Sequence, residues 1–376
     1  MRYFDLDIHD LGERDLAAWR AFAAPGGRLS SPYLLPEFAQ AVAQAREDVR
    51  VLVAEENGAP CAFFAYHAGP VARPVGAPMS DYQGVVARSG TAIEPDALLT
   101  AMKAGALVYE NWAGTPAPGR VRQREGSVII DLEGGVQEWL QRRHALHRNH
   151  FRKIAQRARR AEREYGPARI VIGDAAGAHF EMLKAWKAAQ YRETGKLDLF
   201  AIPWVATVLA GLAARRFGPL RGLTSALYYG DRLAAVEFGL AAGGVYHSWF
   251  PAYDPAFAPV SPGLQLLHGL VEAAPRLSIS RIDLGKGESH YKKYYGDYEV
   301  PLSQGRVLAS SLAAAGIAGW DFAESIAARL PRPLADAPAR LRRRWAQTSA
   351  FEPDLRRRLM LMRQAVGDQL GATRRA

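Results

Sequence analysis

The chain has 376 residues, of which 49% are hydrophobic and 10% aromatic, and its formal net charge is +10. This length exceeds that of one ordinary hydrophobic core, so we expect two domains and an extension. No apolar run approaches the roughly 20 residues of a membrane-spanning helix. The single cysteine, Cys61, excludes an internal disulfide and a thiolate metal cluster. The acidic N-terminal residues lack the apolar segment of a secretory signal, so we expect a cytoplasmic protein.

The positive charge is concentrated in two segments. Residues 139–165 carry nine Lys and Arg against two Glu, and residues 329–376 carry twelve against four acidic residues. Such segments can attract an anionic membrane, an acidic partner or a nucleic acid, although a solvated helix face explains them equally well. Peripheral attachment at the inner membrane through the basic C-terminal helices is therefore one alternative to a purely cytoplasmic location.

The first half of the sequence predicts an α/β arrangement. The Asn57-Gly58 pair between two apolar runs favours a tight β-hairpin within residues 49–70. Residues 111–125 are rich in Pro and Gly and predict a loop. The other expected elements are strands over 2–8, 81–87 and 126–132, and helices over 13–24, 35–45 and 94–103.

The second half begins with a basic segment that predicts one long helix from Val136 to about Tyr165, ended by Gly166-Pro167. Glycine-containing turns at 230–231 and 243–244 then favour a three-strand antiparallel meander. The remaining expected elements are strands over 168–174, 223–229, 232–241 and 244–250, helices over 176–194, 203–217 and 262–274, then a short strand, a Tyr-rich helix up to 296, and basic helices beyond 310.

The helix expected near 262–274 has a start suited to phosphate. Pro262 fits the first helical position, Ser261 fits the N-cap, and Gly263 leaves room for close approach to the backbone. Free N–H groups and the helix dipole attract anions at such a start, and Leu264 would lie beside them. Lys292 or Lys293 could contact the same phosphates. The alternative is an ordinary capped helix whose leucines pack into the core.

Three side chains have the chemistry for proton transfer, as a base for an attacking group or an acid for a leaving group. Glu237 lies in an otherwise apolar strand, where burial would raise its pKa towards a useful value. Tyr291 begins the Tyr-rich helix and could serve as the acid. His247 alternates with its neighbours and could face a substrate cleft. A solvated strand glutamate, a packed histidine and structural tyrosines are the alternatives.

These segments, in this order, resemble the second half of a GNAT acyltransferase domain, specifically that of the CelD/BioF2-like acetyltransferase family. Residues 184–200 are similar to that family's Lys-x-x-Gln-Tyr-x-x-Thr-Gly segment, residues 31–42 and 79–86 are similar to its amino-terminal elements, and the similarity extends over about residues 30–310. The Gly-rich pyrophosphate loop of GNAT enzymes keeps only Gly263 here, which leaves the donor open.

The resemblance implies a strand at 244–250 that separates from its neighbour, pairs with the pantetheine arm and presents a backbone N–H to the thioester. It also implies that a phenol, Tyr291, protonates the leaving thiolate. The acceptor would be bound by Asp81, Tyr82, Lys187, Gln190 and Tyr191. We expect no metal, because His144, His147 and His150 lie among arginines without a neighbouring carboxylate.

We therefore predict an α/β protein with tandem GNAT-like mixed-sheet domains and a basic helical C-terminal extension. The predicted parts are an N-terminal GNAT-like domain (1–135), a basic linking helix (136–166), a C-terminal GNAT acyltransferase domain (167–310) and the extension (311–376). The predicted function is N- or O-acyl transfer from acyl-CoA, as acetyl-CoA or a longer chain, to an amine or hydroxyl. The resemblance implies a saccharide or small-molecule acceptor in exopolysaccharide or cell-envelope biosynthesis.

Two other functions remain open. FemX-like transferases share the tandem fold and take an aminoacyl group from tRNA, which a degenerate pyrophosphate loop and basic helices would also suit. A nucleic acid is a partner only under that hypothesis. Alternatively, the protein is a non-catalytic GNAT-fold accessory protein of polysaccharide synthesis.

Overall fold

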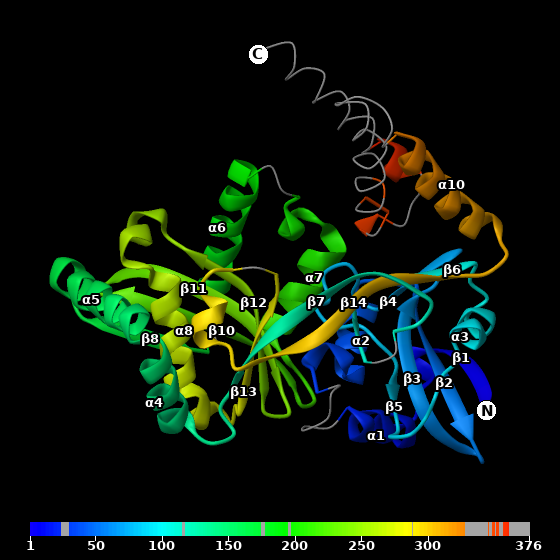
Figure 1. The fold of residues 1–376 in the computed structure, drawn as a ribbon, viewed down its shortest axis with the longest axis horizontal. Coiled ribbons are helices and arrows are strands. Elements are labelled where there is room, and N and C mark those ends of the chain that lie inside the picture. The colour runs from blue at the N-terminus through cyan, green and yellow to red at the C-terminus, as the bar shows by residue number, and fades with distance from the viewer. Residues whose placement is uncertain are drawn as a thin grey trace, which may run out of the picture.

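A mixed sheet of fourteen strands runs along the long axis of the part that the computed structural model describes (Figure 1). The described residues are 1–23, 30–114, 117–173, 177–194, 197–287 and 289–327, with short pieces at 345, 348–349, 351–352 and 356–360. Most of the basic C-terminal segment predicted to attach to a membrane or acidic partner lies outside them. None of the described helices is long and apolar enough to cross a membrane.

Strands from the first half of the chain form one end of the sheet. The predicted hairpin is confirmed, because β2 and β3 pair antiparallel around Asn57 and Gly58, both of which have positive φ. Residues 81–87 were predicted as a strand, but only their last two form one, β5. The strands here are β1 (Arg2–Asp7), β2 (Val49–Glu56), β3 (Ala59–His67), β4 (Val71–Pro74), β5 (Val86–Ala87) and β6 (Ala106–Ala113).

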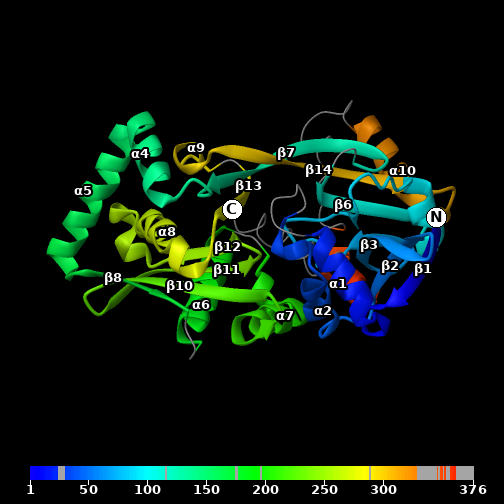
Figure 2. The ribbon, with the colours of Figure 1, turned by 90° about the horizontal axis from the view of Figure 1, so that it is seen from below.

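Two long strands, β7 (Arg120–Asp131) and β14 (Tyr298–Leu308), join the two ends of the sheet (Figure 2). β14 comes late in the chain, yet it pairs with β6 on one side and β7 on the other. β7 then pairs with β13 (Arg281–Lys286). The loop predicted over 111–125 is therefore wrong at both its ends, since these backbone pairings hold residues 111–113 and 120–125 in strands.

The other end of the sheet is the predicted meander, which is confirmed. β10, β11 and β12 pair antiparallel in order, and β8 pairs with β10. β12 also pairs in parallel with β13. Their bounds are β8 (Ala168–Ile172), β9 (Arg216–Phe217), β10 (Leu220–Tyr229), β11 (Arg232–Ala242) and β12 (Val245–Tyr253).

Helices cover both faces of the meander. Val236, Phe238 and Leu240 of β11 pack in the core that contains α6 and α7, whereas Ala235 and Ala241 pack in the core that contains α5 and α8. Alternation along the strand therefore places Glu237 on the α8 face. The helices are α1 (Glu13–Phe22), α2 (Pro36–Ala43), α3 (Pro95–Met102), α4 (Val136–Leu146), α5 (Arg148–Tyr165), α6 (Ala178–Thr194), α7 (Pro203–Ala214), α8 (Pro262–Ala273), α9 (Lys292–Tyr295) and α10 (Leu312–Ala327).

The basic segment predicted as one helix is two helices. His147 interrupts it with φ −132° and ψ 39°, values that belong to neither helix. Phe151, Ile154 and Ala161 of α5 are buried, whereas most of its arginines are exposed, so α5 packs against the second half of the chain by one apolar face. The predicted division into domains at 135, 166 and 310 stays a prediction.

Replacing Gly239 with alanine is expected to destabilise the meander by about 1–3 kcal/mol. A Cβ on Gly239 would lie 2.3 Å from the His247 carbonyl oxygen and 2.6 Å from the Tyr246 hydroxyl oxygen, at the point where the register of β11 and β12 shifts. Urea unfolding would measure the loss. Gly263→Ala is the control, since a Cβ there meets nothing within 4 Å, and an equal loss in both variants would contradict this reasoning.

Candidate active site

β12 leaves its parallel neighbour β13 soon after the two strands meet. They pair only at Val245–Arg281, Tyr246–Ile282 and His247–Asp283, whereas β12 remains paired with β11 as far as Tyr253. Within the described residues, the edge of β12 beyond His247 has no strand partner on that side. A ladder that opens in this way can pair with an extended ligand arm.

The chain reaches α8 directly after this open edge, through a short 3-10 helix over Pro255–Val260. Pro262 occupies the first helical turn as predicted. Ser261 occupies the N-cap position with φ 55°, but its side chain does not cap the helix as predicted. Its hydroxyl instead accepts a hydrogen bond from Arg157 at 2.8 Å. Gly263 leaves open space over the first turn, whereas the N–H groups of Leu264 and Gln265 donate to the Ser261 carbonyl oxygen at 3.2 and 3.4 Å.

A pocket of about 740 Å³ lies beside the start of α8. It is bounded by the turn between α4 and α5, by the inward side of α5, by Leu264 of α8 and by the residues around α9. Two residues predicted from the sequence, Leu264 and Tyr291, therefore line the same pocket although they are distant in the chain.

Glu237 is buried on β11 and points to the α8 face, 3% exposed. The Tyr246 hydroxyl donates a hydrogen bond to its Oε1 at 3.0 Å. Burial raises the Glu237 pKa, although hydrogen bonds and nearby positive charge, including that of Lys187, oppose the rise. A carboxylate with a raised pKa and one supporting donor is well suited to accept a proton.

Tyr291 lies at the start of α9, which is only one turn long rather than the longer helix predicted. Burial, followed by the charge of Glu237, raises the Tyr291 pKa to about 12. The phenol therefore keeps its proton at neutral pH. Tyr291 lines the pocket beside α8, whereas Glu237 is not part of that lining.

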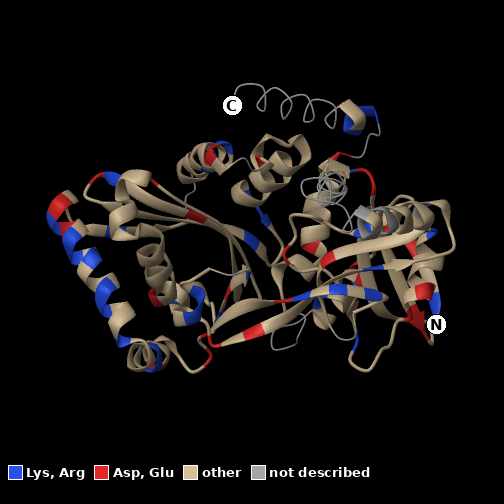
Figure 3. Ribbon diagram, turned by 45° about the horizontal axis from the view of Figure 1, so that its top comes forward, with Lys and Arg blue, Asp and Glu red and all other residues tan. Residues whose placement is uncertain are grey.

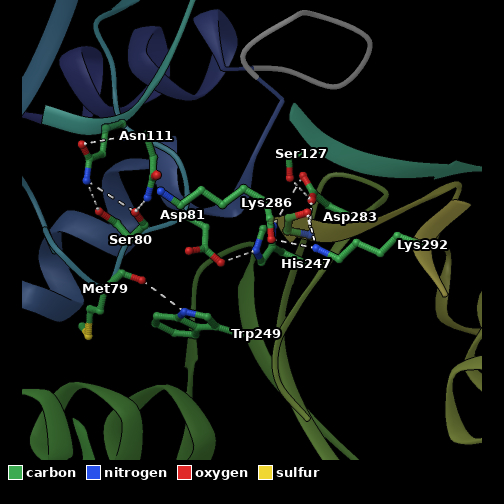
Figure 4. Close-up of polar contacts among 12 residues, drawn as sticks. Met79, Ser80, Asp81, Asn111, Ser127, His247, Trp249, Asp283, Lys286 and Lys292 are labelled. Carbon is green, nitrogen blue, oxygen red and sulfur yellow. Dashed lines mark hydrogen bonds and ion pairs between the residues drawn. The ribbon is translucent and has the colours of Figure 1, made fainter. Parts of the chain in front are cut away.

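His247 is fully buried between two carboxylates (Figure 4). Its Nε2 lies 2.8 Å from Asp81 Oδ2, and its Nδ1 lies 3.5 Å from Asp283 Oδ2. Burial alone would lower the His247 pKa, but the charges and hydrogen bonds of Asp283 and Asp81 outweigh it and raise the pKa to about 10. His247 is therefore a cation at neutral pH, which suits a positioning role better than that of a base.

The second carboxylate of this cluster, Asp283, is held by several donors. Its Oδ1 accepts hydrogen bonds from the Ser127 hydroxyl at 2.5 Å and from the Gly285 N–H at 2.8 Å. Burial would raise the Asp283 pKa, yet the His247 charge, followed by the hydroxyls of Ser127 and Tyr82, holds it below its usual value. Tyr82, predicted to face the acceptor, lies against the His247 ring with centroids 5.9 Å apart.

Lys292 takes a different position from the one predicted. It is 6% exposed, and its Nζ donates to the carbonyl oxygens of Gly285 and Lys286, each at 2.8 Å (Figure 4). These bonds direct the ammonium to the end of β13. Lys292 does not line the pocket beside α8, so the structure does not bring it to the predicted phosphate site.

The three predicted acceptor residues of α6 lie together. Lys187 donates to Gln190 Oε1 at 3.1 Å, and its Nζ lies 5.8 Å from the Tyr191 ring centroid. Burial raises the Tyr191 pKa to about 12, with Asp198 adding to the rise. The Lys187 charge lowers the Glu237 pKa, but α6 packs on the face of the meander opposite to the one that carries Glu237.

Several residues of the site were not found from the sequence. Tyr33 is 1% exposed and packs edge-on against His247, with centroids 4.9 Å apart. The Ser127 hydroxyl donates to Asp283, and the Tyr246 hydroxyl donates to Glu237. The position of Tyr246 next to His247 in a strand was the only sequence signal. Within the described ranges, no group of three or more His, Cys, Asp or Glu residues could hold a metal.

Comparisons with known proteins concern the domain type and the fold. The family model of the acetyltransferase (GNAT) domain matches residues 148–293, which include the open edge of β12, α8 and Tyr291. The structure of FemX is similar, with a TM-score of 0.50 and 11% identity over 81% of this chain and 97% of that chain. A tandem GNAT protein from the clavulanic acid biosynthesis pathway has a TM-score of 0.43 and 11% identity over 82% and 99%.

A search of curated protein sequences found no match. The predicted α/β fold of GNAT type, with a large mixed sheet, is confirmed, and the CelD-like branch stays a prediction. Residues 148–293 of this chain are therefore similar to an acetyltransferase (GNAT) domain.

Proposed function

We propose that the protein transfers an acyl group from an acyl-CoA to an amine or hydroxyl acceptor by direct attack, without a covalent enzyme intermediate. The observation that carries the proposal is the open edge of β12 with the buried Glu237 behind it and the start of α8 after it. The pantetheine arm would lie along this edge. The Gly263 N–H and the dipole of α8 would face the donor's phosphates.

In the proposed reaction the acceptor nitrogen or oxygen bonds to the acyl carbon while the carbon–sulfur bond breaks. Glu237 takes the proton that the acceptor loses. Tyr291, whose pKa of about 12 keeps it protonated, gives a proton to the departing thiolate. The carboxyl and the phenolate then return to their starting states by exchange with solvent.

For the acceptor we propose a saccharide or another small molecule in exopolysaccharide or cell-envelope biosynthesis, as the CelD-like resemblance implies. Asp81 and Tyr82 lie beside His247, and Lys187, Gln190 and Tyr191 lie on α6. Asp81 and Tyr82 contact His247 of β12, and α6 packs against the same strand, which supports an acceptor site between them.

A second candidate donor is aminoacyl-tRNA, and one observation favours it. The exposed side of α5 carries arginines along most of its length, as Figure 3 shows for the helix at the far end of the molecule. A surface of this kind can contact a phosphate backbone, and its affinity for tRNA would fall steeply with added salt.

Calorimetric titration with acetyl-CoA and longer acyl-CoAs, at low and moderate salt, tests the proposal. We expect micromolar, salt-tolerant binding. Gly263→Pro should abolish it, because proline lacks the N–H that would face the phosphates, whereas Gly263→Ala keeps that N–H and should bind normally. Binding of tRNA alone would point to the second donor, and binding of neither ligand would favour a non-catalytic accessory role.

A further inference from the structure

The pocket beside α8 has strongly basic walls. Its volume is about 740 Å³, and it contains no Asp or Glu among its lining residues. Permanent cations come from one helix only, α5, which supplies Arg148, Lys153 and Arg157. The rest of the lining consists of Ala145, Leu146, His147, Asn149, His150, Ile154, Leu264, His290, Tyr291 and Tyr294.

Among the described residues, the three cations in the pocket lining have no acidic neighbour, whereas Arg160 of the same helix has one. Arg160 lies 3.6 Å from Glu164, one turn away. Within the described part of the chain, Arg148, Lys153 and Arg157 have no carboxylate at ion-pair distance. Like charges gathered in a concave site without a carboxylate raise the local positive potential, and an anionic ligand relieves it.

Arg157 connects the basic wall to the start of α8. Its Nη1 donates to the Ser261 hydroxyl at 2.8 Å, which holds the guanidinium at the first turn of the helix. Lys153 lies one turn earlier on α5 and so shares its face. The helix dipole and two side-chain cations from a separate helix therefore act on the same volume.

We propose that α5 supplies the nucleotide-phosphate site of the donor, with Arg157 and Lys153 binding phosphate groups of the 3′,5′-ADP part of CoA. This inference rests on the proposed acyl-CoA function. It explains how the chain can dispense with a Gly-rich pyrophosphate loop, of which only Gly263 remains. A guanidinium binds phosphate through two parallel N–H donors, so Arg157 gives direction as well as charge.

Adenosine 3′,5′-bisphosphate, which carries the phosphates without the thioester arm, is the probe. We expect Lys153→Gln and Arg157→Gln each to weaken its binding to the full chain by about tenfold, and the double variant by more. Arg159→Gln is the matched control, because it removes the same charge from the same helix outside the pocket lining, and it should change affinity less than about twofold. Thermal unfolding checks that all variants remain folded.

Acetyl-pantetheine separates this inference from the proposed function, because it has the thioester arm but no phosphate. The double variant should lose affinity for acetyl-CoA and keep that for acetyl-pantetheine. If acetyl-CoA binds wild type and double variant equally, the α5 site is wrong while the acyl-CoA function stands. If wild type binds tRNA but neither acetyl-CoA nor the bisphosphate, both are wrong.

Discussion

Replacing Glu237 with glutamine is expected to lower the rate of acyl transfer at saturating donor and acceptor by about 100-fold or more, the usual contribution of a general base. The amide has nearly the same shape but cannot accept the acceptor's proton. Binding of acetyl-CoA should be unchanged, because the donor's phosphates lie at α8 and not at β11. Steady-state kinetics and calorimetry together measure both quantities.

The pH dependence gives a sharper test of the same residue. Burial raises the Glu237 pKa, so the rate should rise with pH through a value above the usual one for glutamate. Tyr246→Phe removes the hydroxyl that donates to Glu237 at 3.0 Å. The Glu237 pKa should then rise further, and the rise of the rate should move to higher pH while the base itself is kept. If the rate of Tyr246→Phe rises with pH at the same value as in wild type, or if Glu237→Gln turns over normally, Glu237 is excluded as the base.

Glu237→Gln should lower the rate of acyl transfer without lowering the stability of the fold. A carboxyl whose pKa is higher in the folded state binds its proton more tightly there, so the folded state loses stability as pH rises from the unfolded pKa to the folded one. Glu237→Gln removes this loss and should be at least as stable at neutral pH. Glu272→Gln, an exposed glutamate on α8, is the control for both rate and stability.

The sequence was sufficient for the meander because its strands are apolar and its turns contain glycine. Gly230, Gly243 and Gly244 all have positive φ, which makes these turns visible from residue type alone. The same local signals located the start of α8, but they left open whether Glu237 is buried or solvated, and only the structure shows that it is buried.

Residues whose neighbours are distant in sequence could not be found in this way. The first half of β7 is largely exposed and polar, and it is a strand because β14, more than 170 positions later, pairs with it. The His247 cluster depends on the same long-range closure, since Asp81 and Ser127 reach it from separate elements. Periodicity reports burial along one element and carries no information on which elements meet.

Replacing His247 with alanine is expected to destabilise the protein by about 3–5 kcal/mol, because it leaves Asp283 buried and charged without its cation. Asp283 is 3% exposed, so water cannot take the place of the imidazolium. Urea unfolding at neutral pH would measure the loss. Adding Asp283→Asn to His247→Ala should restore part of the stability, and a double-mutant cycle that shows independent effects would contradict the pairing.

The pH dependence of stability follows from the two pKa shifts in this cluster. The His247 pKa is raised from 6.5 to about 10, so its contribution is complete below pH 6.5 and is lost as pH rises through about 10. The Asp283 pKa is lowered, so its contribution is present above the usual aspartate pKa of 3.8 and is lost in more acidic solution. The stability difference between wild type and His247→Ala should therefore be greatest from about pH 4 to 6.5 and shrink towards pH 10. A difference that stays constant from pH 5 to 10 would show that His247 is neutral in the folded protein.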